Sequence, residues 1–170
     1  MKLNKKASLP VLLAAVFLFL SLLMFGKHYA SAEDQAEGWV RELYTVSRQL
    51  DLEEWSQAEV RECYDRRFGN RITEEAKADL EHLCLPYVIL FQQTPAPVER
   101  SCVTQLALEQ VDHPEKGTKQ FRYDVWIMVT LEKGTEVLAP VEEQHYWGTV
   151  SLEKNGRFGW KLSGVTIEYL

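Results

Sequence analysis

The chain has 170 residues, of which 46% are hydrophobic, 26% charged and 11% aromatic, a composition typical of a globular protein. Four lysines and no acid lie in residues 1–32, which leaves 15 basic and all 25 acidic residues to residues 33–170, a formal net charge of −10. Such an acidic domain repels phosphate backbones and anionic lipid, so nucleic acid is not an expected partner.

Residues 1–32 have the three parts of a secretory signal. A basic start precedes the apolar run Val11–Phe25, and a small-residue pattern that signal peptidases cleave ends at Ala32. The alternative is a retained membrane anchor, because residues 9–26 approach the roughly 20 apolar residues of a spanning helix. Under either interpretation residues 33–170 form an extracytoplasmic domain, secreted after cleavage or held at the cytoplasmic membrane by one N-terminal helix.

The first half of this domain is predicted to be helical. Apolar residues recur at steps of three and four over residues 36–50, which predicts an amphipathic helix. A second helix is expected over residues 51–67, because Asp51 is a good N-cap. A third covers residues 73–91, and Pro86 inside it predicts a kink or a break.

The second half changes to a two-residue period. The alternation predicts strands over residues 102–112, 119–132, 137–152 and 157–169. The apolar face of the last strand shifts by one residue at Ser163-Gly164, which predicts a β-bulge. Helices followed by a four-stranded antiparallel meander predict an α+β domain, with about three N-terminal helices packed on one face of the sheet.

All three cysteines, Cys63, Cys84 and Cys102, lie in the exported part, where disulfides can form. Three cysteines allow at most one internal bridge. Cys84 and Cys102 flank a proline-containing loop. A disulfide between them would add on the order of 3 kcal/mol to the free energy of unfolding. A Cys63–Cys84 bridge and three small buried residues are the alternatives. No paired ligand motif surrounds the cysteines, so no metal site is predicted.

The order of elements resembles the nuclear transport factor 2-like, or cystatin-like, superfamily. The closing segment carries the resemblance, with a turn at residues 154–156, then Trp160-Lys161-Leu162, then a bulged strand containing Val165 and Ile167. The resemblance implies helices folded into the concave face of a curved, cone-like sheet. The superfamily includes isomerase-like enzymes, small-ligand binders and assembly modules. The layout of this chain is similar to that of the membrane-anchored scaffold subunits of type IV secretion and conjugation machines.

The inner face of the predicted sheet offers little chemistry. Its residues are almost all apolar, and we expect Tyr123 and Tyr146 to be core tyrosines with bonded hydroxyl groups. No motif of a nucleophile, a phosphate loop or a metal site is present, so we expect no catalytic residue and no cofactor. The alternative hypothesis is a small-ligand-binding or isomerase-like pocket inside the cone, lined by Tyr87, Phe91, Tyr123 and Tyr146.

The outer face of the two middle strands is predicted to carry an aromatic patch. Trp126, Met128 and Trp147 form its centre, with His145 and Arg122 near its rim. Such a patch is typical of a protein interface, the alternative being a loop or the N-terminal helix that covers it. The resemblance agrees, since many superfamily members pair through this face. The sequence therefore favours a non-enzymatic binding or assembly module outside the cytoplasmic membrane, with a protein partner or a second copy at the patch. The layout suggests a secretion or conjugation apparatus as its setting.

Overall fold

The computed structural model of the chain describes residues 31–47, 57–91, 96–111, 116–132, 141–156 and 159–168. They all belong to one compact unit, Ser31–Leu170. None of the described helices is long and apolar enough to cross a membrane. The apolar run of the predicted export segment lies outside the described residues, so the signal-peptide and anchor interpretations stay predictions.

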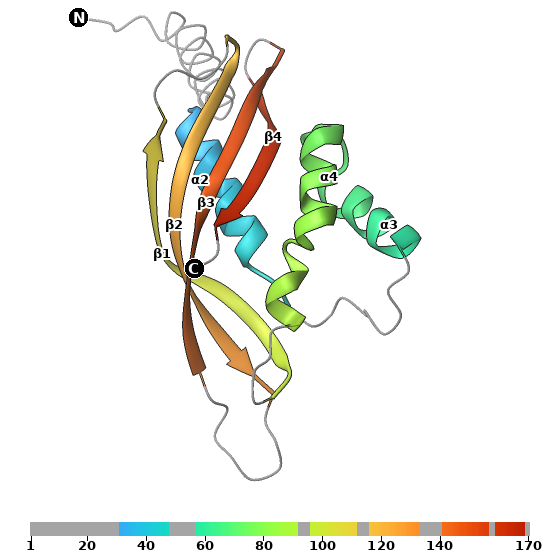
Figure 1. Cartoon of the computed structure of the whole chain (residues 1–170), viewed down its shortest axis with the longest axis vertical. Coiled ribbons are helices and arrows are strands. Elements are labelled where there is room, and N and C mark those ends of the chain that lie inside the picture. The colour runs from blue at the N-terminus through green and yellow to red at the C-terminus, as the bar shows by residue number, and fades with distance from the viewer. Residues whose placement is uncertain are drawn as a thin grey trace, which may run out of the picture. The chain divides into compact units, whose positions relative to one another are not determined.

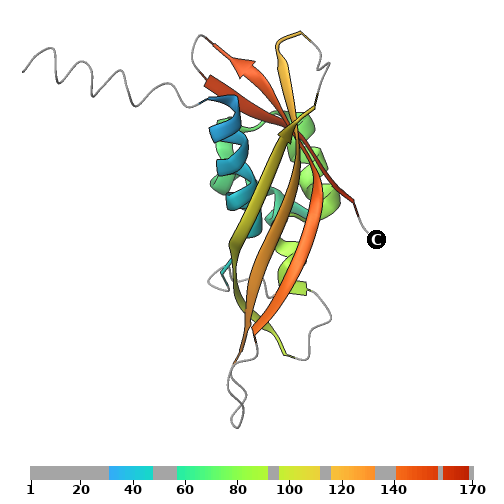
Figure 2. The ribbon, with the colours of Figure 1, turned by 90° about the vertical axis from the view of Figure 1, so that its left-hand side faces the viewer.

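The helices precede the strands along the chain. They are α2 (Ala32–Tyr44), α3 (Gln57–Phe68) and α4 (Glu74–Leu83), with 3₁₀ turns η1 (Gly69–Arg71) and η2 (Tyr87–Phe91). One antiparallel sheet follows, in the order β1 (Val98–Gln110), β2 (Thr118–Leu131), β3 (Val141–Asn155) and β4 (Gly159–Glu168). The helices lie on one side of this curved sheet (Figures 1 and 2). The predicted α+β fold is thus confirmed.

Helix α2 begins at a capping box. The Asp34 N–H donates to the Ser31 hydroxyl at 3.0 Å, and the Ser31 N–H donates to the Asp34 carboxylate at 2.9 Å. Ser31 is therefore the N-cap, and Ala32 is the first residue of the helix. The predicted cleavage after Ala32 would remove this cap, whereas a retained N-terminal segment would keep it.

Helix α2 ends at Tyr44, well before the predicted end at residue 50. The chain then runs beside β1. The Ser101 N–H donates to the Val46 carbonyl at 2.9 Å, and the Val46 N–H donates to the Ser101 hydroxyl at 3.2 Å. The predicted helix is wrong over residues 45–47, because the β-branched Val46 pairs with β1 there. Asp51, the predicted N-cap of the next helix, lies outside the described residues.

Two predicted irregularities of the backbone are confirmed. Helix α4 ends at Leu83, so the helix does break before Pro86. In the last hairpin Ser151 pairs with Gly164 and Leu152 pairs with Leu162, so one extra residue, at position 163, forms the bulge.

The core lies between the helices and the inner face of the sheet. Alternate side chains of β2 are buried, as the two-residue period predicts: Phe121, Tyr123, Val125, Ile127, Val129 and Leu131. The buried helical side chains include Trp39, Val40, Leu43, Tyr44, Tyr64, Phe68 and Leu80. Burying each large apolar side chain contributes roughly 2 kcal/mol to the free energy of unfolding.

The hydroxyl of Tyr123 joins α2 to the sheet. It lies 2.9 Å from the Tyr44 hydroxyl at the end of α2, and it donates to the Thr166 carbonyl on β4 at 2.9 Å. On its way to β4 it passes Gly148 of β3, where a Cβ atom would lie 2.8 Å from it. The Ser101 hydroxyl of β1 also donates to the Tyr44 carbonyl, at 2.8 Å. The end of α2 is therefore fixed to three strands.

A Gly148→Ala substitution should destabilise the domain, because its Cβ would lie 2.0 Å from the Thr166 carbonyl oxygen. We expect the free energy of unfolding to fall by roughly 3 kcal/mol as β3 and β4 move apart. Gly38→Ala on α2 is the control, since its Cβ meets nothing within 4 Å. The free energy of unfolding of the control should rise by up to about 1 kcal/mol, because alanine has a higher helix propensity than glycine. Urea unfolding measures both, and wild-type stability of Gly148→Ala would contradict the close approach.

A Ser31→Ala substitution removes the hydroxyl that caps α2, and we expect it to cost about 1 kcal/mol near neutral pH. The hydrogen bonds with Ser31 lower the pKa of Asp34 below its ordinary value. The part of the capping interaction that involves the Asp34 carboxylate is therefore present above the unfolded-state pKa of Asp34 and is lost as the pH falls through the folded-state value, whereas the hydrogen bond from the Asp34 N–H does not titrate. Urea unfolding across this range should show the deficit of the variant shrinking in acid, and a constant deficit would argue against the role of Asp34.

Candidate functional site

The outer face of the sheet carries the predicted aromatic patch. Trp126 and His145 are paired across β2 and β3, and their rings stack with centroids 4.3 Å apart and planes 9° apart. The ring of Trp147 lies 5.2 Å from that of His145. Met128 is 40% exposed. We call these four residues, Trp126, Met128, His145 and Trp147, the outer-face patch.

His145 lies at the centre of the patch and not at its rim, which corrects the prediction. The register places it directly opposite Trp126, and its Nε2 lies 3.2 Å from the Asp124 carboxylate. Arg122 is exposed and its guanidinium lies 3.7 Å from the Glu109 carboxylate. The described helices lie on the opposite side of the sheet, so α2 does not cover the patch (Figure 2).

The described tyrosines of the second predicted site, inside the sheet, belong to the core or pack against it. Tyr87 and Tyr123 are both fully buried. The Tyr87 hydroxyl lies 3.0 Å from the Cys63 sulfur, and burial raises the pKa of Tyr87 to about 12. The half-buried Tyr146 donates to the Gln144 side chain at 3.1 Å. The side chain of Phe91 lies outside the described residues. The described tyrosines therefore act as core residues.

The predicted Cys84–Cys102 bridge is not formed, because all three cysteines are free. Ser101 points into the junction between α2 and the sheet, so its neighbour Cys102 points to the outer face, opposite Met128. Cys84 is the C-cap of α4, among the helices. The two thiols are exposed on different sides of the domain, whereas Cys63 is buried.

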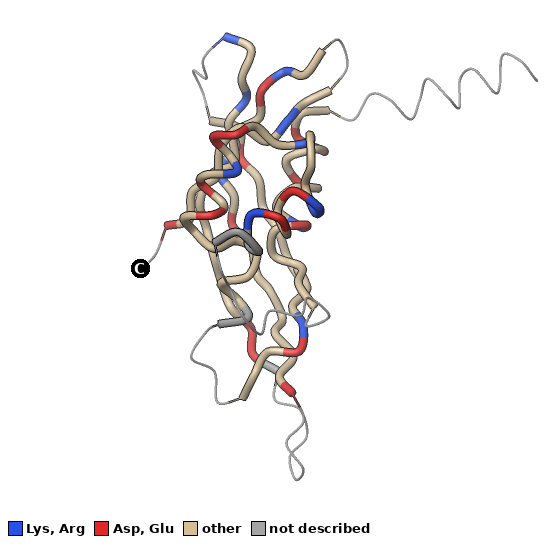
Figure 3. Tube along the Cα trace, turned by 90° about the vertical axis from the view of Figure 1, so that its right-hand side faces the viewer, with Lys and Arg blue, Asp and Glu red and all other residues tan. Residues whose placement is uncertain are grey.

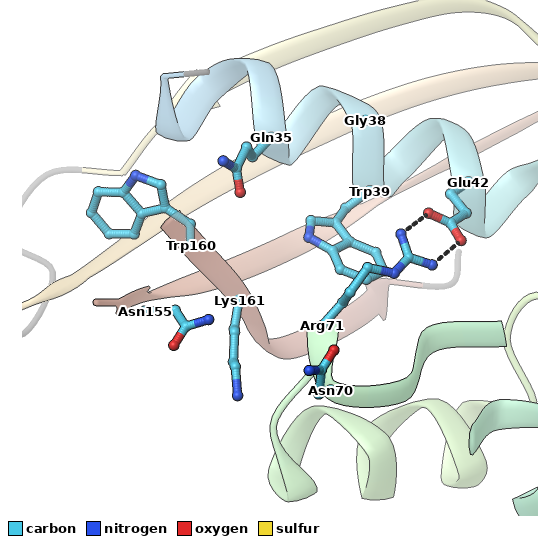
Figure 4. A pocket seen from close by; sticks show the side chains of 9 residues that line it. All are labelled: Gln35, Gly38, Trp39, Glu42, Asn70, Arg71, Asn155, Trp160 and Lys161. Atoms are coloured by element: carbon cyan, nitrogen blue, oxygen red, sulfur yellow. Dashed lines mark hydrogen bonds and ion pairs between the residues drawn. The ribbon is translucent and has the colours of Figure 1, made fainter. Parts of the chain in front are cut away.

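A cleft of about 350 Å³ lies on the helical side of the sheet (Figure 4). Its residues come from α2, η1 and the β3–β4 hairpin: Gln35, Gly38, Trp39, Glu42, Asn70, Arg71, Asn155, Trp160 and Lys161. The sequence did not predict it, because three distant segments supply it and no spacing motif links them. The only signal in the sequence is the pair Trp160-Lys161 in the closing segment, which also carries the resemblance to the superfamily.

One wall of the cleft is a fixed ion pair. Arg71 donates two hydrogen bonds to the Glu42 carboxylate, at 2.8 and 3.0 Å, and its guanidinium carbon lies 5.0 Å from the centre of the Trp39 ring. The hydrogen bonds to Glu42 raise the pKa of Arg71 further above its ordinary value. Acidic and basic positions are interspersed along this side of the domain (Figure 3), and Glu42, Arg71 and Lys161 give the cleft the same mixture.

No family model and no curated protein matches the chain. A solved structure described as "Ntf2 like protein involved in plasmid conjugation" is similar to it, with a TM-score of 0.46 and 13% identity over 82% of this chain. The chain spans about half of that structure, 51% of its length. That description names the superfamily which the closing segment of this sequence resembles.

Alkylation of the native protein should distinguish the three thiols. We expect Cys84 and Cys102 to react quickly because both are exposed, and Cys63 to react only after unfolding because it is buried. Mass spectrometry of the alkylated, digested chain measures each rate. An intact mass two hydrogens below that of the fully reduced chain would show that a bridge forms and that the free-thiol arrangement is wrong.

Proposed function

We propose that residues 33–170 form a non-enzymatic binding and assembly module that works outside the cytoplasmic membrane. The outer-face patch carries this proposal, because it is a partly exposed cluster of aromatic side chains and Met128 on the side of the sheet opposite the described helices. Its occupant, in this proposal, is a second copy of the same chain.

The architecture supports an occupant of the patch. Helices cover one face of the sheet, whereas Met128 is exposed on the other and Trp126 and Trp147 are half-buried there. Aromatic side chains and methionine with polar groups around them are the usual centre of a protein interface. A second sheet stacked about 10 Å away would supply the missing layer and bury these side chains.

The charges beside the patch support a second copy as that occupant. Two formally acidic domains of net charge −10 repel each other, so their contact needs a face on which charge is compensated. Beside the patch the Glu109 carboxylate has the Arg122 guanidinium as its partner at 3.7 Å, and the Asp124 carboxylate lies within hydrogen-bond distance of His145 Nε2, at 3.2 Å. A two-fold axis would bring this same face together from both chains.

The location rests on residues 1–32. Their basic start and apolar run support export of the domain. If the apolar helix is retained, the module is held at the membrane as a subunit of a secretion or conjugation apparatus. If cleavage occurs after Ala32, it is a soluble secreted module. The N-terminus of the chain recovered from cells, read by mass spectrometry, separates these two settings.

Trp126→Glu should weaken self-association. The substitution places a second carboxylate beside that of Asp124 at the centre of the interface, where burying a charge is costly. We expect a loss of at least about 2 kcal/mol, or roughly 30-fold in the dimer dissociation constant. Sedimentation velocity over a concentration series of residues 31–170 measures it.

Ala78→Glu is the matched control, because Ala78 is exposed on α4 and the substitution adds the same charge. It should associate as the wild type does. Alkylation gives a second readout: association should slow the reaction of Cys102, which lies opposite Met128, and leave that of Cys84 unchanged. A wild-type chain that stays monomeric would overturn the second-copy proposal. If the chain is monomeric and the alkylation of Cys102 slows only when a membrane extract is added, the partner is a different protein.

A further inference from the structure

The cleft on the helical side has features of a ligand site that the outer-face patch does not explain. Its volume of about 350 Å³ is within the range of small-ligand sites, and six of its nine residues have polar side chains. It lies between α2, η1 and the β3–β4 hairpin, so a ligand there would contact three parts of the fold at once (Figure 4).

The wall formed by α2 and η1 is already organised without a ligand. Arg71 holds Glu42 with two hydrogen bonds and donates a third to the Arg67 carbonyl at 2.7 Å. The Trp39 ring is only 6% exposed, and it contacts Arg71 and, at 5.8 Å between centroids, Phe68. A ligand would therefore meet a rigid edge that offers carboxylate oxygens and guanidinium N–H groups side by side.

The opposite end of the cleft has an aromatic surface. Trp160 of β4 lines this end, packs partly against the core and is half-buried. Trp39 cannot play this role, because Arg71 lies over its ring. The cleft therefore has an aromatic side chain at one end and a charged pair at the other (Figure 4).

Between these two ends lie polar side chains that are free to bind. Among the described residues, Gln35, Asn70, Asn155 and Lys161 have no protein partner for their side chains. Each of the three amides carries both donors and an acceptor. A hydroxyl group likewise donates and accepts, so several neighbouring hydroxyls match this set better than a carboxylate or phosphate, which only accept.

We propose that the cleft binds a neutral oligosaccharide, with one pyranose ring against Trp160 and its hydroxyls bonded to the amides and to the Glu42–Arg71 pair. An anionic ligand fits less well, because Arg71 is engaged by Glu42 and the domain carries a net charge of −10. A wholly apolar ligand would leave the polar lining unpaired. This site is separate from the outer-face patch and does not rest on the function proposed for it.

The test is NMR titration of the ¹⁵N-labelled domain, residues 31–170, with maltotriose, cellotriose and the trimer of N-acetylglucosamine, each to about 10 mM, within the weak affinities expected of a small open site. We expect at least one trimer to shift the Trp160 indole signal and the amide signals of Gln35, Asn70 or Asn155. Trp160→Ala should weaken binding at least about tenfold, and Asn155→Ala by roughly two- to tenfold. No shift with any of the three trimers would overturn the proposal.

Lys161→Gln separates a sugar site from an anion site, since it removes the charge and keeps a hydrogen-bond donor. The dissociation constant for the sugar should change less than about twofold in this variant and should not depend on the salt concentration. Loss of binding in Lys161→Gln, or displacement of the sugar by citrate, would overturn the proposal in favour of an anion.

Trp126→Glu should bind sugar as the wild type does, and Trp160→Ala should self-associate normally, so each proposal can fail without the other. The unfolding midpoint of Trp160→Ala controls for a loss of fold, and Asn155→Ala, whose side chain is exposed, keeps the test valid if Trp160→Ala is unstable.

Discussion

The fold depends on one buried contact, in which the Tyr123 hydroxyl meets the Tyr44 hydroxyl and the Thr166 carbonyl. A buried hydroxyl without partners is costly, so both tyrosines must reach one another for the core to close. The side chain of Tyr123 crosses a neighbouring strand to do this, and Gly148 is the residue that lets it pass. One hydroxyl thereby couples the end of a helix to the far edge of the sheet.

The position of α2 follows from this contact and decides what the rest of the surface can do. Arg67 of α3 donates to the Glu42 and Thr45 carbonyls, at 2.7 and 3.0 Å, and so satisfies the C-terminal end of α2. With α2 held on the inner face, Trp39 packs into the core and Glu42 is presented to Arg71. The same placement leaves the outer face of β2 and β3 without any of the described helices over it.

Local patterns in the sequence were sufficient for β2 and for the bulge of β4. They were insufficient for the junctions and for the start of β1, which lies at Val98 and not at the predicted residue 102. The alternation along β2 and the one-residue shift at Ser163-Gly164 are visible in a short window, so both were predicted correctly. The end of α2 was missed because Val46 suits either a helix or an extended segment, and only its distant partner Ser101 decides between them. The prediction placed His145 at the rim for a related reason. Alternation along one strand shows which face a side chain is on, but only the pairing register between two strands shows which residues lie opposite each other.

The two surfaces lie apart on the same sheet, and this makes the functions proposed for them compatible. The outer face of β3 presents His145 and Trp147 near the middle of the strand, whereas Asn155 at its far end lines the cleft together with residues of α2 and η1. Two copies joined at their outer faces would leave both clefts uncovered and turned away from each other. In such a pair two weak sugar contacts could act together, because the second contact forms within an assembly already held by the first. Self-association would then raise the avidity of the module for a polymeric glycan without changing the cleft itself.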